Sequence, residues 1–154
     1  MKRKKICFIS SAGGHLEQIK QLKSLKECYD YYYVLPRNKS TEKFTEKKYF
    51  VSEFIRNNKL LYVVGLMITF VQQLFIFLKE RPDVVITTGA GLAIPTCIYA
   101  KLFKKKVVYI ESFARINSVN KTGKLIYKYA DLFIVQWETL LEFYPNATYG
   151  GWIY

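Results

Sequence analysis

Short apolar runs alternate with amphipathic segments along most of this chain. The runs are four or five residues long, rich in β-branched and aromatic side chains, and typical of buried strands; they cover residues 6–10, 31–35, 84–87, 107–110 and 132–135. Between them, apolar residues at helical spacing predict helices over 15–26, 92–103 and 137–143, and another that ends near Tyr129. This alternation predicts an α/β fold with a Rossmann-like, doubly wound and mostly parallel sheet.

Two segments fit the alternation less well. Residues 37–48 are polar without a clear period and predict either a loop or a short exposed helix, and a weak strand is expected over 49–54. The chain has 154 residues, which is long enough to bury a proper core, so we expect a single domain over 1–154.

Residues 60–78 contain no charged side chain and predict a long apolar helix. Such a helix would be about 28 Å long, close to the hydrocarbon thickness of a bilayer. A crossing would separate the strands at 6–10 and 84–87, although one sheet needs both of them. Gln72 and Gln73 also suit a helix at the membrane surface or against protein. We therefore favour a helix that packs partly on the sheet and partly in the membrane surface; a buried or a spanning helix remain alternatives.

The first strand runs into a glycine turn that opens a helix. In the segment ICFISSAGGHLEQ, Ser11 precedes Gly13 and Gly14, and His15 begins the helical pattern. Glycines let a bound group approach backbone amides at the positive end of the helix, so an anionic ligand is the expected occupant. The full G-x-G-x-x-G spacing is absent, and no lysine follows as in a P-loop. A tight turn without a ligand is an equally good interpretation of the glycines alone.

Two further loops are expected at the same edge of the sheet. One carries Gly89 and Gly91 after the strand at 84–87, and the other carries Glu111 and Arg115 after the strand at 107–110. Ligands of doubly wound sheets bind at the carboxyl ends of the strands, so the convergence of three such loops favours a site. Gly89 and Gly91 would allow close approach at its centre, with a tight helix–sheet contact as the alternative.

Net charge and cysteine content narrow the possible partners. Lysine and arginine outnumber aspartate and glutamate by 24 to 12, and 51% of residues are hydrophobic, which favours an anionic membrane surface over nucleic acid. The basic runs at 2–5 and 104–106 also fit solvated strand ends. Three distant cysteines and one histidine argue against a metal site or a disulfide framework and for a reduced cytoplasm. The first apolar run is too short for a signal peptide, so export is not expected.

Four motifs in order carry a family resemblance over nearly the whole chain; they are ISSAGGHLEQ, TTGAGLAIP, YIESFAR and WETLLEFYPNATYGGWIY. They resemble the PssD-like bacterial polysaccharide-biosynthesis proteins, which are similar to the membrane-recruiting subunit of the eukaryotic dolichol-linked GlcNAc transferase. The resemblance implies the N-terminal, acceptor-binding half of a GT-B glycosyltransferase. It also implies a separate small partner chain that supplies the C-terminal half and most of the UDP-sugar site, and it implies no metal or other cofactor.

The resemblance implies an acceptor-binding, membrane-docking subunit, nearly inactive alone. With its partner it would move a sugar from a UDP-sugar to a polyprenyl-diphosphate-linked saccharide in capsule or exopolysaccharide synthesis. The eukaryotic relatives begin with an anchoring membrane helix that this sequence does not show. Peripheral attachment to the cytoplasmic face of the plasma membrane is then expected to rest on the basic surface and on one face of the 60–78 helix, through Leu60, Val64, Met67, Val71 and Phe75. The apolar residues 151–154 suit docking onto the partner.

The resemblance also implies roles for the loop residues. Substrate would be bound by loop glycines and nearby polar side chains, namely Ser11, Gly13, Gly14, Gly89, Gly91 and Arg115. His15, whose pKa the helix N-terminus would lower, is a candidate general base or a scaffold for its loop. Glu111 is the other candidate base, with a structural hydrogen bond or a salt bridge to Arg115 as the alternative.

Two other classes of function compete with this interpretation. A Rossmann dinucleotide binder is disfavoured, because no third glycine follows Gly14 and no acidic residue ends the second strand, at Leu35-Pro36-Arg37. A non-catalytic stabiliser that only recruits a transferase to the membrane is not distinguished by sequence from an acceptor-binding subunit.

Overall fold

A single seven-stranded sheet forms the centre of the molecule in the computed structural model, which describes residues 3–52 and 59–153, apart from the side chains of residues 59 and 60. All of its strand pairs are parallel, and the spatial order is β3-β2-β1-β4-β5-β6-β7. The strands are β1 (Lys5–Ile9), β2 (Asp30–Pro36), β3 (Lys48–Val51), β4 (Val84–Thr87), β5 (Lys106–Ile110), β6 (Leu132–Val135) and β7 (Thr148–Tyr149). The predicted parallel sheet is confirmed.

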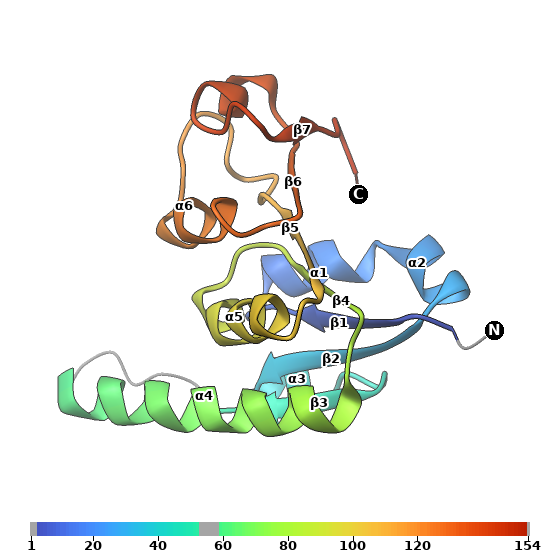
Figure 1. Cartoon of the computed structure of the whole chain (residues 1–154), viewed down its shortest axis with the longest axis vertical. Coiled ribbons are helices and arrows are strands. Elements are labelled where there is room, and N and C mark those ends of the chain that lie inside the picture. The colour runs from blue at the N-terminus through green and yellow to red at the C-terminus, as the bar shows by residue number, and fades with distance from the viewer. Residues whose placement is uncertain (1–2, 53–58, 154) are drawn as a thin grey trace.

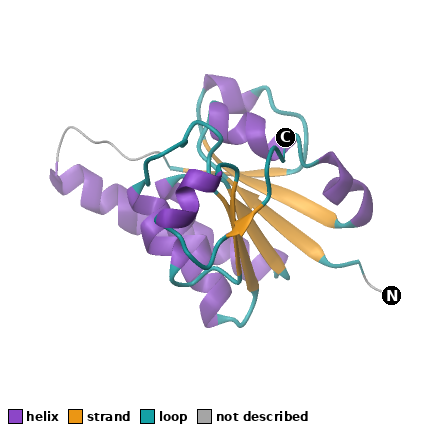
Figure 2. Ribbon diagram, turned by 90° about the horizontal axis from the view of Figure 1, so that it is seen from above, coloured by secondary structure: helices purple, strands orange, loops and turns teal. Residues whose placement is uncertain are grey.

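Helices cover both faces of this sheet (Figures 1 and 2). They are α1 (Gly14–Lys20), α2 (Lys23–Cys28), α3 (Lys39–Glu42), α4 (Lys59–Glu80), α5 (Ile94–Leu102) and α6 (Lys121–Tyr127), with 3₁₀ turns η1 (Gly91–Ala93) and η2 (Glu138–Glu142). Residues of α1 and α2 pack in one apolar cluster, and residues of α4, α5 and α6 pack in the other. The fold is therefore doubly wound, as predicted.

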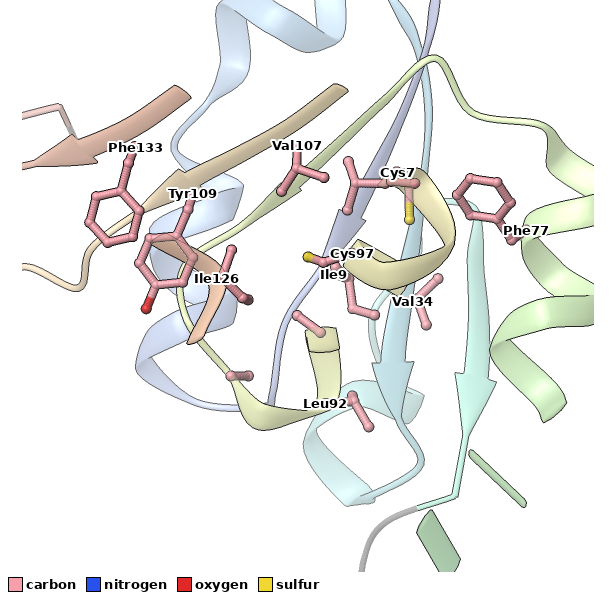
Figure 3. Packing of buried hydrophobic residues seen from close by; sticks show 14 of the residues in the cluster. Cys7, Ile9, Val34, Phe77, Leu92, Cys97, Val107, Tyr109, Ile126 and Phe133 are labelled. Atoms are coloured by element: carbon pink, nitrogen blue, oxygen red, sulfur yellow. The ribbon is translucent and has the colours of Figure 1, made fainter. Parts of the chain in front are cut away.

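The strand sequences build the two clusters because side chains alternate between the faces of a sheet. In β1, Ile6 and Phe8 lie in the cluster under α1, whereas Cys7 and Ile9 lie in the cluster under α5. All four are 3% exposed or less. Figure 3 shows Cys7 and Ile9 beside Cys97 of α5, with Phe77 of α4 at the edge of the same cluster. The short apolar runs of the sequence thus supply both layers of the core.

Some predicted helices differ in detail from the structure. The single helix expected over 15–26 is two helices, because Leu22 (ψ 52°) leaves the helical region between α1 and α2. The break lets Leu22 and Leu25 both pack partly buried against the sheet. The helix expected over 92–103 begins as η1 and continues as α5, with Pro95 in the first turn, where its missing amide hydrogen costs little. The expected helix over 137–143 is the 3₁₀ turn η2, and β7 was not expected at all.

The segment between the second and third strands takes one of its two predicted forms. It contains the short helix α3, whose start is fixed by a capping box in which Asn38 Oδ1 accepts from the Thr41 amide at 3.0 Å. The weak strand predicted over 49–54 is β3, which ends at Val51; residues 53 and 54 lie outside the described part of the chain.

The long helix α4 connects β3 to β4 and packs on α5. Its buried positions recur at helical spacing, at Thr69, Gln73, Phe77 and Glu80. Residues 61–80 are long and apolar enough to cross a membrane, with a mean hydropathy of 2.1, but only 17% of that stretch is buried in the protein. A simply buried helix is therefore wrong. The strands before and after the helix belong to one sheet, which disfavours a crossing.

The chain reverses its direction of travel across the sheet at α4. Strands β1, β2 and β3 extend outward to one edge, and α4 then crosses back so that β4 pairs with the other side of β1. In doubly wound folds the crevice between two such neighbouring strands is where ligands bind. Figure 1 shows the N-terminal half of α4 projecting past the carboxyl ends of the strands.

Candidate functional site

A cleft of about 800 Å³ lies at the carboxyl ends of β1 and β4, where the strand order reverses. Its walls are formed by the loop after β1, the end of β2, the N-terminal half of α4, and the segment from the loop after β4 to the start of α5. The lining residues are Ser11, His15, Pro36, Tyr62, Leu66, Phe70, Gly89, Ala90, Gly91, Leu92 and Ile94. Among the predicted site residues, Ser11, His15, Gly89 and Gly91 therefore lie together in one cavity.

The loop after β1 contributes the first polar wall. Gly13 has a φ of +79°, a conformation that side-chain-bearing residues rarely adopt, and it allows the strand to turn directly into α1. Gly13 and Gly14 are exposed, and a Cβ at either position would meet no atom within 4 Å. They lie beside the cleft rather than in its lining. The open space over their backbone is compatible with a bound anion.

His15 is held where the two polar loops meet. The Thr88 hydroxyl donates to the His15 carbonyl oxygen at 3.1 Å and so joins the loop after β4 to the start of α1. Burial lowers the pKa of His15; the nearby Arg115 charge lowers it further, and a hydrogen bond with the Thr88 backbone opposes both. The imidazole is therefore biased toward its neutral form, which can accept a proton.

Two polar atoms near this loop have no hydrogen-bond partner among the described residues. One is Nδ1 of His15, and the other is the hydroxyl of Ser10, which is 1% exposed at the end of β1. Buried polar atoms are nearly always hydrogen-bonded, so unpartnered ones need an explanation. Their position next to the cleft fits a site that pairs with a bound molecule or with water.

The loop after β4 contributes the second polar wall. Gly89 has a φ of +103°, and its amide donates to the Thr87 hydroxyl at 3.3 Å. A Cβ at Gly89 would overlap the Tyr109 hydroxyl oxygen, and it would lie 3.1 Å from Cζ of the same ring. At Gly91 a Cβ would make only an ordinary contact, 3.8 Å from the Thr122 hydroxyl. Of these two glycines, only Gly89 has both a backbone conformation and a lack of space that require glycine.

Glu111 lies behind this loop and does not line the cleft. Its side chain has no exposed surface, and it accepts hydrogen bonds from the Ser112 amide at 2.9 Å and from Asn120 Nδ2 at 2.7 Å. Tyr109 and Tyr144 donate at 3.5 and 3.3 Å. Burial raises the pKa of Glu111, while these donors and the Arg115 charge oppose the rise. This geometry favours the structural alternative over a general base.

Arg115 is exposed, and its guanidinium Nη1 donates to the Ser118 hydroxyl at 3.3 Å. It forms no ion pair with Glu111, although the structure describes both residues, so of the two structural alternatives for Glu111 the salt bridge is wrong. It lies outside the cleft lining, yet close enough to lower the pKa of His15. Within the described ranges no three His, Cys, Asp or Glu side chains gather as ligands for a metal ion.

The apolar wall of the cleft was not predicted from the sequence. It consists of Tyr62, Leu66 and Phe70, one side of the projecting half of α4. A crossover helix runs antiparallel to the strands it connects, so its first turns must lie near the carboxyl ends of the strands. That argument was available from the predicted order of elements and would have found these residues.

The neighbouring face of α4 is an exposed apolar stripe. Four residues predicted to contact a membrane lie on it: Val64, Met67, Val71 and Phe75 are 47%, 62%, 50% and 69% exposed. The side chain of Leu60, the fifth predicted contact, lies outside the described residues. Apolar surface thus extends from the cleft wall onto the outside of the helix.

A second group of aromatic residues lies toward the β7 edge of the sheet, after the carboxyl ends of β5 and β6. Trp152 is 77% exposed and packs on Phe113, whose ring also contacts Trp137; the ring centroids are 5.2 and 5.0 Å apart. The Trp137 indole nitrogen donates to the Phe113 carbonyl oxygen at 2.8 Å. In Figure 1 this C-terminal region lies far from α4, so the two apolar surfaces are separate.

Comparison with curated proteins finds relatives named as subunits of one transferase. The chain is 29% identical to the UDP-N-acetylglucosamine transferase subunit ALG14 of Mus musculus over 179 aligned positions, which cover 96% of this chain and 82% of that protein. It is 37% identical to the subunit of the same name from Homo sapiens over 79 residues, 47% of this chain and 37% of the human one. It is 39% identical to the Candida albicans subunit over 48% of this chain and 36% of that protein.

Solved structures share the fold at low identity. MurG of Acinetobacter baumannii matches 88% of this chain with a TM-score of 0.66 and 16% identity. UDP-N-acetylglucosamine 2-epimerase of Rickettsia bellii matches 93% with a TM-score of 0.73 and 15% identity. The chain spans only 42% and 41% of these enzymes, so it corresponds to one part of a larger, Rossmann-like architecture. The family model for Alg14-like oligosaccharide biosynthesis proteins matches residues 6–153, and this chain therefore belongs to that family.

Proposed function

We propose that this chain is the acceptor-binding, membrane-docking subunit of a two-chain glycosyltransferase, which moves a sugar from a UDP-sugar to a polyprenyl-diphosphate-linked saccharide. The observation that carries the proposal is the cleft, with polar loops after β1 and β4 on one side and the apolar side of α4 on the other. A polyprenyl diphosphate has the same two parts. The relatives named as UDP-N-acetylglucosamine transferase subunits support this class of reaction.

In this proposal the diphosphate lies against the polar loops. The exposed backbone at Gly13 and Gly14 and the Ser11 hydroxyl donate hydrogen bonds, and the Arg115 charge neutralises the anion without a metal ion. Gly89 and Gly91 bring their backbone close to the ligand. His15, neutral because of its lowered pKa, accepts a proton from the attacking sugar hydroxyl.

The polyprenyl chain leaves the cleft along α4 toward the membrane. The exposed stripe of this helix would enter the interface of the cytoplasmic leaflet, and the net charge of +12 favours anionic lipid. The protein would then be peripheral, with the mouth of the cleft at the lipid surface. The biological setting we propose is capsule or exopolysaccharide synthesis.

A second small chain would complete the enzyme. The chain spans about two fifths of the solved enzymes that share its fold, so we place the rest of the UDP-sugar site on a partner of the C-terminal GT-B type. Trp152, which packs on the half-buried Phe113, offers exposed aromatic surface, and aromatic residues are enriched at protein interfaces. We expect little or no sugar transfer by this chain alone.

Calorimetric titration with farnesyl diphosphate, a short polyprenyl diphosphate, tests the amphiphilic cleft. It should bind at least about tenfold more tightly than inorganic pyrophosphate or farnesol, because only the intact molecule contacts both walls. The variant Leu66→Glu places a charge in the apolar wall and should weaken binding about tenfold or more. The matched control is Met67→Glu, one position further along α4, where the side chain is exposed and outside the cleft.

The control should bind farnesyl diphosphate like the unaltered chain. Equal affinity for pyrophosphate and farnesyl diphosphate would show that the apolar wall takes no part in binding. Equal losses in the two glutamate variants would mean that charge on α4, rather than the cleft, controls affinity. Either result would overturn the proposal.

A further inference from the structure

Glu111 is the centre of a buried polar network that connects three parts of the chain. One carboxylate oxygen, Oε1, accepts from Asn120 and Tyr109, and the other, Oε2, accepts from Tyr144. The Glu111 carbonyl oxygen accepts from Gln136 Nε2 at 2.9 Å. A fully buried carboxylate is costly unless its oxygens are satisfied, and here both are.

The network directly supports the loop that lines the cleft. The Tyr109 hydroxyl fills the space where Gly89 would carry a Cβ, and Asn120 Nδ2 lies 3.5 Å from that same position. Asn120 Nδ2 also donates to the Tyr109 hydroxyl at 3.2 Å. The two groups behind Gly89 are therefore held by each other and by Glu111.

We propose that Glu111 is a positioning residue, which acts through Tyr109 and Asn120 to fix the shape of the loop at residues 89–91. The inference rests on the proposed function, because that loop forms one polar wall of the acceptor cleft. Glu111 itself touches no ligand. Its hydrogen bonds hold the Tyr109 hydroxyl and Asn120 Nδ2 in contact with Gly89, which has no side chain that could fix the loop.

The carboxylate accepts on both sides of this network, whereas an amide can accept on only one side at a time. An ionised carboxylate only accepts hydrogen bonds, and Glu111 faces donors at both oxygens. Replacement by glutamine points an amide NH₂ either at the Asn120 amide nitrogen and the Ser112 backbone amide or at Tyr144. In the first orientation donor meets donor behind Gly89, so Asn120 and Tyr109 lose their fixed arrangement. In the second orientation the Tyr144 hydroxyl has to accept instead of donate, and the amide oxygen still faces Asn120. Tyr109→Phe removes the hydroxyl behind Gly89 in either case, so it tests the inference independently.

A general structural role is separable from positioning because the network has two sides. Oε1 faces the groups behind Gly89, whereas Oε2 faces Tyr144 at the end of η2, away from the cleft lining. The variant Tyr144→Phe removes the hydrogen bond to Oε2 and so costs stability, but it keeps the hydrogen bonds that Oε1 accepts from Ser112, Asn120 and Tyr109. It is a matched control for stability loss without loss of the contacts behind the loop.

Hydrogen exchange of backbone amides and titration with farnesyl diphosphate test the inference on the complete chain. Glu111→Gln should speed exchange at residues 89–91 at least about tenfold more than in β1, and should weaken farnesyl diphosphate binding by a similar factor. Tyr144→Phe should lower the melting temperature while exchange at 89–91 and affinity stay within about twofold. Tyr109→Phe keeps the ring stacked on Phe133, with 4.5 Å between centroids, and should reproduce the Glu111→Gln pattern more weakly.

Two results would overturn the inference. One is unchanged exchange at 89–91 in both Glu111→Gln and Tyr109→Phe. The other is a set of equal losses of affinity in Tyr144→Phe and Glu111→Gln. If Glu111→Gln does not fold, Tyr109→Phe against Tyr144→Phe decides the question. Failure of the unaltered chain to bind farnesyl diphosphate would contradict the proposed function, and the exchange measurement would still decide the role of Glu111.

Discussion

Gln73 of α4 forms hydrogen bonds with Thr96 in the first turn of α5. Its Oε1 accepts from the Thr96 amide at 3.1 Å and from the Thr96 hydroxyl at 2.6 Å, and its Nε2 donates to the Leu92 carbonyl oxygen at 3.0 Å. Gln73 is 1% exposed. The polar residue in the middle of the most apolar helix therefore faces protein, and its hydrogen bonds fix which side of α4 packs on α5.

The first prediction concerns this contact. Gln73→Leu keeps the size of the side chain but leaves the Thr96 amide and the Leu92 carbonyl oxygen buried without partners. We expect a loss of about 2–4 kcal/mol in the free energy of unfolding, measured with urea. The control Gln72→Leu removes one hydrogen bond from the Ser52 amide at a half-buried site and should cost no more than about 1 kcal/mol. Equal losses in the two variants would contradict the special role of Gln73.

The second prediction concerns membrane attachment. Changing Val64, Met67 and Val71 together to glutamate puts three charges on the exposed stripe of α4 and should abolish sedimentation with phosphatidylglycerol vesicles. The control adds the same charge at exposed polar positions elsewhere, as Gln21→Glu and Asn146→Glu with Ser24→Glu. It should weaken binding only modestly, because general charge attraction falls while the apolar stripe is intact. Continued sedimentation of the stripe variant would contradict the model.

The third prediction concerns acid stability through Glu80, at the end of α4. Burial alone would raise the pKa of Glu80, but hydrogen bonds from Lys47, Tyr49 and Lys5 outweigh it and lower the pKa from 4.5 to about 2. Because the folded pKa is the lower one, the stabilisation is complete above pH 4.5 and is lost as pH falls toward 2. Glu80→Gln should therefore cost about 2 kcal/mol at pH 7 and much less at pH 2.5. A difference that stays constant over this range would contradict the assignment.

The strand alternation and the polar loops were predictable because they depend on local pattern. Apolar runs with period-two burial gave the strands, and parallel pairing then required the loops with Ser11 and Gly89 to meet at one edge. The partners of Glu111 could not be found in this way, since Asn120 and Tyr144 lie 9 and 33 residues away and only tertiary packing brings them together. A buried carboxylate and a catalytic one look the same in sequence.

The fourth prediction tests the space behind the loop after β4. Gly89→Ala must place a methyl group against the Tyr109 hydroxyl at a backbone φ of +103°, and should cost about 1–3 kcal/mol. Gly91→Ala meets only the Thr122 hydroxyl at 3.8 Å in an ordinary conformation, so its cost should be under about 1 kcal/mol. Urea unfolding of the two variants measures the difference. Similar costs would mean that Tyr109 does not hold Gly89 from behind.

The last prediction separates catalysis from scaffolding at His15 in the chain reconstituted with its partner transferase. Loss of a general base lowers kcat by about 10²–10⁴-fold, whereas loss of a hydrogen bond that shapes the loop mainly raises the KM for the acceptor. We expect His15→Ala to lower kcat at least about a hundredfold, because His15 lines the cleft and its imidazole is biased to the neutral form. Glu111→Gln should mainly raise KM, since Glu111 acts behind the loop.

The pH profile adds an independent readout for the same residue. A base works only while it is deprotonated, so a pKa of His15 below 6.5 keeps kcat/KM high until the pH falls below that value. The acidic limb of the profile should therefore lie below pH 6.5 and should disappear in His15→Ala. A variant that keeps near-normal kcat and the same acidic limb would place the base on the partner chain. This protein would then bind the acceptor and dock on the membrane without taking the proton.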